Sequence, residues 1–70
     1  MALDERYRWR IQDGVVDVHG RSKAIGVGIE HGRVIVDTQG WASLAPDAAD
    51  TLKYSVETAS TIAREQQRRS

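Results

Sequence analysis

Hydrophobic and polar residues alternate through the first half of the chain, which is the pattern of β-strands with one buried face. The first of these segments places Tyr7, Trp9 and Ile11 on one face and arginines on the other. Four segments are predicted to be strands: 6–12, 15–19, 24–30 and 33–38. Their side-chain period of two predicts a sheet with one apolar face.

Two dipeptides that end in glycine separate these segments and predict two β-hairpins. Asp13-Gly14 suits a type I′ turn, in which both central residues need positive φ, and His31-Gly32 closes the second hairpin. Counting outward from each turn pairs apolar residues with each other and opposite charges with each other: Ile11 with Val16, Trp9 with Val18, Arg10 with Asp17, Ile29 with Val34, Val27 with Val36 and Glu30 with Arg33. A slip of one residue would turn every side chain to the other face, so this agreement indicates the register.

A long helix is predicted over residues 46–67, because Pro46 suits its first turn and Asp47 lies where the helix dipole favours negative charge. An apolar stripe follows at helical spacing: Ala48, Leu52, Val56, Ala59, Ile62 and Ala63. The predicted fold is α+β: a four-stranded antiparallel β-meander with one long C-terminal α-helix packed on its apolar face.

The predicted fold sets the expected domain limits and the expected core. We expect residues 1–5 to be disordered, 6–66 to form a single domain and 67–70 to be a frayed tail. Trp41 is expected to pack over the core where the chain leaves the sheet. The expected core is Trp9, Ile11, Val16, Val18, Ile25, Val27, Ile29, Val34, Val36, Leu52, Val56 and Ala59.

The predicted helix is longer than the predicted sheet. It would be about 33 Å long, against about 20 Å for a six-residue strand. The overhang, near residues 58–67, carries Ala59, Ile62 and Ala63. A second copy of the chain could cover it and form a homodimer, since small side chains let helices approach closely. The alternative is a tail that frays beyond Ala63.

Charge and cysteine content narrow the function classes. Ten Lys and Arg residues balance ten Asp and Glu residues, so no net charge attracts nucleic acid or an anionic membrane. The longest apolar run, 34–36, is too short to span a bilayer. With no cysteine, disulfides and thiolate metal sites are excluded. No secretory signal is recognisable at the N-terminus, so we expect a cytoplasmic protein.

No catalytic, cofactor or metal site is predicted. His19 and His31 lie at expected turns, and neither belongs to a group of residues with catalytic or metal-ligand spacing. We therefore expect that the protein is not an enzyme.

Two glycines of the third predicted strand, Gly26 and Gly28, point away from its apolar face. Strand glycines often allow another backbone to approach closely. With Ile35 and Val15 they would form a flat patch for a protein partner, unless large cross-strand neighbours cover them. Tyr54 lies opposite the helix stripe and is either a contact anchor or an ordinary exposed aromatic residue. The candidate partner or dimer surface is thus Gly26, Gly28, Ile35, Tyr54, Ala59, Ile62 and Ala63.

Arg6, Arg8 and Arg10 form an outward row on the first predicted strand. Arginines interleaved with aromatic residues can bind nucleic acid. The aromatic side chains here point to the opposite face, however, and charges also protect an edge strand from aggregation. A solvated edge is therefore the preferred interpretation, and nucleic-acid binding the alternative.

The hairpin Ile25-Gly26-Val27-Gly28-Ile29-Glu30-His31-Gly32-Arg33-Val34-Ile35-Val36, followed by Leu44-Ala45-Pro46-Asp47-Ala48-Ala49, resembles a group of small uncharacterised proteins of actinobacteria and their phages. The resemblance covers residues 24–63. This chain departs from the pattern at Ala45, where a capping serine is usual, and at His31, where an acidic residue is usual. The resemblance implies no catalytic residues, and it implies a phage-encoded accessory protein that acts on a host protein.

These observations together predict a non-enzymatic interaction or regulatory module that binds a second copy of itself and an unidentified protein. The alternative is a nucleic-acid-binding regulator that uses the arginine row and the basic C-terminal tail.

Overall fold

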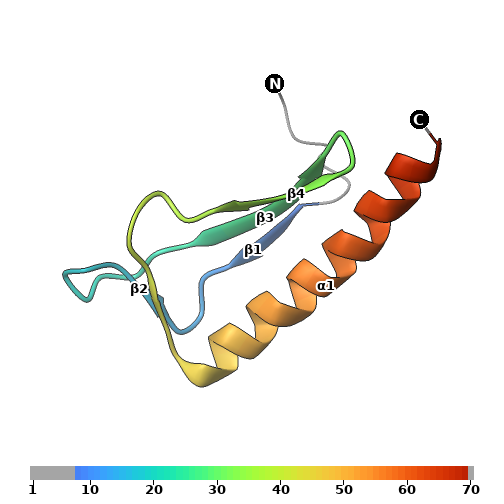
Figure 1. Ribbon diagram of the computed structural model, residues 1–70. Helices are drawn as coiled ribbons and strands as arrows, with labels where there is room; N and C mark the ends of the chain where they lie inside the picture. The colour runs from blue at the N-terminus through green and yellow to red at the C-terminus, as the bar shows by residue number, and fades with distance from the viewer. Residues whose placement is uncertain (1–7, 70) are drawn as a thin grey trace.

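Two antiparallel sheets and one long helix make up the computed structural model, which describes residues 8–69 (Figure 1). The elements are β1 (Trp9–Ile11), β2 (Val15–Val16), β3 (Ile25–Glu30), β4 (Arg33–Asp37), β5 (Ser43–Leu44) and α1 (Pro46–Arg69). Sheet A has the strand order β1-β3-β4, and sheet B pairs β2 with β5. The α+β class and the C-terminal helix are confirmed, whereas the chain does not form one four-stranded meander. The predictions for residues 1–5, Arg6 and Tyr7 lie outside the described residues.

The second predicted hairpin is confirmed residue by residue. Val27 pairs with Val36 and Glu30 pairs with Arg33 across β3 and β4. His31 and Gly32 have φ of 51° and 74°. Two positive φ values in succession are the geometry of a type I′ turn, whose twist matches that of the strands it joins.

The first predicted hairpin is wrong. Gly14 has φ of 77° but Asp13 keeps a negative φ. Turns whose first central residue has negative φ, types I and II, splay the two strands. The turn instead packs against the start of α1, where the N–H of Ala45 donates to the carbonyl of Gly14 over 2.8 Å. β1 therefore pairs with β3, and β2 pairs with β5.

The predicted pair of Arg10 and Asp17 is lost with that hairpin. Arg10 lies opposite Gly26 in sheet A. The carboxylate of Asp17 instead accepts hydrogen bonds from the backbone N–H groups of His19 and Arg21, over 2.8 and 3.0 Å. Asp17 thus organises the loop after β2.

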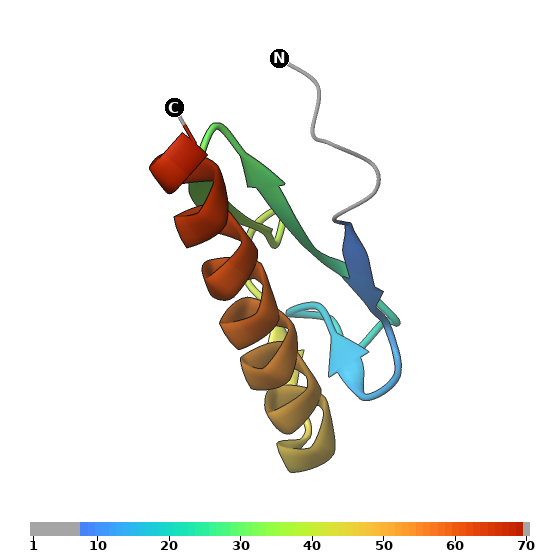
Figure 2. The same ribbon diagram turned by 90° about the vertical axis from the view of Figure 1, so that its right-hand side faces the viewer.

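The core lies between α1 on one side and the strands on the other (Figure 2), and β1, β2 and β3 contribute the core residues of the strand side. Its buried hydrophobic residues are Ile11, Val15, Ile25, Val27, Ile29, Ala48, Ala59 and Ala63. Val18 and Val36 were expected there but are 65% and 46% exposed. Val18 lies in a loop beyond the end of β2, and Val36 lies on the edge strand of sheet A.

Small side chains line the face of α1 that meets the sheet. Ala48, Ser55, Ala59 and Ala63 are buried, and the larger residues of the predicted stripe are half-buried beside them: Leu52, Val56 and Ile62. Small residues at a helix interface let the backbone approach the opposing element closely. Here that element is the chain's own sheet.

The predicted overhang of the helix is wrong, because α1 crosses the sheet diagonally and its last turns lie beside the β3–β4 turn (Figure 1). The N–H of Gly32 donates to Oε1 of Gln66 over 3.0 Å, and Nε2 of Gln67 donates to the carbonyl of Gly32 over 2.9 Å. The helix continues to Arg69, so it does not fray beyond Ala63. The proposed reason for a helix-mediated homodimer disappears.

Candidate binding face

Sheet A has one face against α1. Among residues 8–69, no helix or strand covers the other face, which we call the open face. The pairings alternate accordingly: Trp9 and Val27 lie on the helix side, and Arg10, Gly26 and Asp37 lie on the open face. The three open-face residues are in register, so they form one row across β1, β3 and β4.

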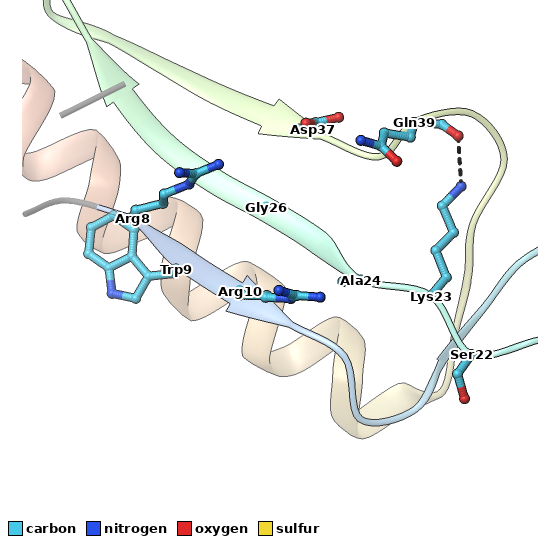
Figure 3. A pocket seen from close by; sticks show the side chains of 9 residues that line it. All are labelled: Arg8, Trp9, Arg10, Ser22, Lys23, Ala24, Gly26, Asp37 and Gln39. Carbon is cyan, nitrogen blue, oxygen red and sulfur yellow. Dashed lines mark hydrogen bonds between the residues drawn. The ribbon is translucent and has the colours of Figure 1, made fainter. Parts of the chain in front are cut away.

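A groove of about 880 Å³ lies along this row (Figure 3). Its lining residues come from β1 and the residue before it, the loop before β3, β3 itself, the end of β4 and the loop after β4: Arg8, Trp9, Arg10, Ser22, Lys23, Ala24, Gly26, Asp37 and Gln39. Gly26 forms the floor of the groove because it has no side chain. A Cβ atom at this position would lie 3.8 Å from the Cβ atom of Asp37, which is an ordinary van der Waals contact. A larger residue at position 26 would fill the space between Arg10 and Asp37.

The two arginines and Asp37 give the groove opposite charges on its two sides. Arg8, immediately before β1, and Arg10, on β1, are exposed, and Asp37 is exposed on β4. An arginine guanidinium binds carboxylates and phosphates through paired hydrogen bonds. The β1 side of the groove is therefore suited to an anionic group, and the β4 side to a cation or a hydrogen-bond donor.

Lys23 closes one end of the groove and is a structural residue that the sequence interpretation missed. Its Nζ donates to the carbonyl of Gln39 over 3.0 Å and to that of Trp41 over 2.8 Å. Both acceptors follow β4, so this ammonium joins two loops. No local signal in the sequence could have shown it, because the acceptors lie 16 and 18 residues further along the chain.

The glycine patch is smaller than expected. Gly26 is half-buried and Gly28 is buried, and Ile35, which faces Gly28 across the strands, is half-buried. Gly28 thus follows the alternative interpretation, in which neighbouring groups cover the glycine. Val15, which was also expected to line this patch, is buried in the core. Only Gly26 offers a partly exposed floor.

The other candidate surface residues are not brought together with this patch. Ala59 and Ala63 are buried against the sheet of the same chain, so they are core residues and not part of a dimer surface. Ile62 is half-buried against the same core. Tyr54 is 72% exposed on α1, as its helical spacing predicted.

Trp41 is 63% exposed, which contradicts its expected packing over the core. It follows Gly40, whose φ of 100° redirects the chain after β4. Trp41 does not line the groove, so it is a separate exposed apolar side chain of the protein surface.

The two histidines lie at turns, as expected, and both are exposed. Nε2 of His31 lies 3.9 Å from Oε1 of Glu30. Within residues 8–69, no group of three or more His, Cys, Asp and Glu residues could hold a metal ion.

Among the described residues, no helix is long and apolar enough to span a membrane. Comparison with protein families, with curated proteins and with solved structures found no match for this chain.

Proposed function

We propose that this protein is a non-enzymatic interaction module whose groove on the open face binds an acidic segment of a partner protein. The observation that supports the proposal is the row of Arg10, Gly26 and Asp37, with Arg8 beside it. In line with the resemblance to small phage proteins, we propose that the partner is a host protein.

The shape of the groove favours an extended segment over a compact ligand. Its low floor at Gly26 lets another backbone approach the sheet, as strand glycines commonly do. Arg8 and Arg10 would bind carboxylates on one side of the segment, and Asp37 would face its basic or N–H groups. This arrangement of charges would also orient the segment.

Nucleic-acid binding is the second candidate, because Arg8, Arg10 and Lys23 line the same groove. The ammonium of Lys23 already donates to two backbone carbonyls, and Asp37 would repel a phosphate. These two features favour the protein partner. Binding to phosphates would weaken steeply as salt rises.

The test is affinity capture from a lysate of the source or host cells, with and without nuclease. The bait variant Arg8→Glu/Arg10→Glu reverses the charge of the groove. The control Lys53→Glu/Arg64→Glu makes the same change in net charge at exposed positions on α1.

We expect one protein that survives nuclease, is retained by the control bait and is lost with the groove variant. Capture that disappears with nuclease would support nucleic-acid binding in place of a protein partner. Equal capture by the groove and control variants would reject the open face as the binding site.

A further inference from the structure

β4 is an outer strand of sheet A, and within residues 8–69 no strand pairs with its free edge. Such an edge presents backbone N–H and C=O groups that another strand can pair with. Val36 on this strand is 46% exposed although it points to the apolar side of the sheet. Among the described residues, this backbone edge therefore has no pairing strand, and the Val36 side chain is only partly covered.

The hairpin geometry determines which backbone groups face outward. A β-turn is closed by a bond from the N–H of its fourth residue to the carbonyl of its first, which makes Glu30 and Arg33 a hydrogen-bonded pair. Such pairs alternate along an antiparallel ladder. Ile35 and Asp37 therefore point their backbone groups to β3, and Val34 and Val36 point theirs to the free edge.

The sequence of β4, Arg33-Val34-Ile35-Val36-Asp37, is complementary to itself when reversed. An antiparallel copy with its two-fold axis at Ile35 places Arg33 opposite Asp37, and Val34 opposite Val36. We propose that two copies of this chain form a homodimer by pairing their β4 strands in this register, which joins their A sheets into one continuous sheet.

The backbone geometry and the side chains agree on this register. Val34 and Val36, whose N–H and C=O groups face the edge, are the residues that meet as a hydrogen-bonded pair. Arg33 and Asp37 of the second copy meet at a non-hydrogen-bonded position, where side chains lie closer together. The axis also brings the two half-buried Ile35 side chains together on the open face.

The other edge of sheet A is not self-complementary. A two-fold axis at the centre of β1 would place Arg10 against Arg10 of the second copy, and like charges directly opposite each other destabilise a strand pair. The β4 pairing also leaves space for both helices. Two β3 strands would be about 14 Å apart, which exceeds the diameter of about 10–12 Å of a helix.

This inference goes beyond the proposed function and does not depend on it. Asp37 belongs to both surfaces, so the two proposals are separated by their tests. Arg33→Asp changes the β4 edge and no residue that lines the groove, and Arg8→Glu/Arg10→Glu changes the groove and no residue of β4. Each proposal can therefore fail without the other.

The test is the mass in solution, from about 10 µM to about 1 mM, the range in which a small interface associates. We expect the wild type to reach twice the 7.8 kDa of one chain. In the Arg33→Asp variant the new aspartate faces Asp37 of the second copy, and in the Asp37→Arg variant the new arginine faces Arg33 of the second copy. Like charges then lie opposite each other, so each variant should stay monomeric. A mixture of the two variants restores opposite charges at both positions and should form a heterodimer, visible by native mass spectrometry.

A wild type that stays monomeric to the highest concentration would overturn the proposal. Single variants that still dimerise would place the interface elsewhere, and a mixture that fails to associate would reject this register. If either variant fails to fold, amide exchange of the wild type decides the question. The amides of Val34 and Val36 should gain about tenfold protection as concentration rises, and unchanged exchange at these two amides would reject the pairing.

Discussion

The end of α1 is bound to the β3–β4 turn by two hydrogen bonds of opposite direction, which predicts opposite effects of the same substitution at neighbouring positions. Gln66 accepts from the N–H of Gly32, and Gln67 donates to the carbonyl of Gly32. Gln66→Glu keeps an acceptor oxygen and should be tolerated. Gln67→Glu replaces the donor by an oxygen that faces another oxygen, and should destabilise the protein.

The magnitude follows from the burial of Gly32. A buried N–H that loses its acceptor costs about 1–3 kcal/mol, so Gln66→Ala should lower the free energy of unfolding by about 1–2 kcal/mol. We expect a similar loss for Gln67→Glu. A core of this size supplies about 3–5 kcal/mol, and such a loss should lower Tm by roughly 5–15 °C.

The measurement is urea unfolding followed by circular dichroism at 222 nm, with thermal melts of the same variants. A new charge near the C-terminus of a helix costs the same for both glutamates, so their comparison cancels the helix-dipole effect. If Gln66→Glu lost as much stability as Gln66→Ala, or if Gln67→Glu matched the wild type, the hydrogen-bond directions assigned to this contact would be wrong.

Three further predictions concern the core and the loops. Val27→Asp buries an unpaired charge and should leave the chain unfolded by circular dichroism, whereas Val18→Asp at an exposed position should melt like the wild type; a folded Val27→Asp variant would contradict the burial of this face. Ala59→Leu should lower the free energy of unfolding in urea by about 1–3 kcal/mol because the larger side chain separates α1 from the sheet, and Thr61→Leu on the exposed side should not. Equal losses for the two variants would contradict the close contact between α1 and the sheet at Ala59. Lys23→Met should cost about 1 kcal/mol and speed amide exchange in the loop after β4, and unchanged exchange there would show that the two carbonyl contacts do not hold the loop.

The two hairpins show why one register was predictable and the other was not. Both turns end in glycine, and counting outward from either turn along the sequence places apolar residues opposite apolar residues. His31 adopts positive φ and Asp13 does not, and that single backbone difference decides whether the chain returns alongside itself. Where the chain does not return alongside itself, the Gly14 turn packs against Ala45 and Ala48 at the start of α1.

The binding face was predictable only in part. Alternation placed Gly26 and the arginines on the side away from the apolar residues, and the structure agrees. The row of Arg10, Gly26 and Asp37 required the β1–β3 pairing, which joins segments that a hairpin-based interpretation kept apart. Lys23 had no local signal at all, because its two acceptors are distant in the sequence.

The amino-acid sequence by itself determined the elements whose contacts are local: the hairpin of β3 and β4, with its turn and register, and the amphipathic helix that begins at Pro46. Tertiary structure alone decided what each apolar surface meets. The small residues of α1, with Ala59 and Ala63 among them, fit a second helix as well as a sheet, so their spacing could not identify the partner. The diagonal crossing of the helix, the contact at Gly32 and the pairing of β1 with β3 depend on how distant segments pack together, which the pattern along the chain does not encode.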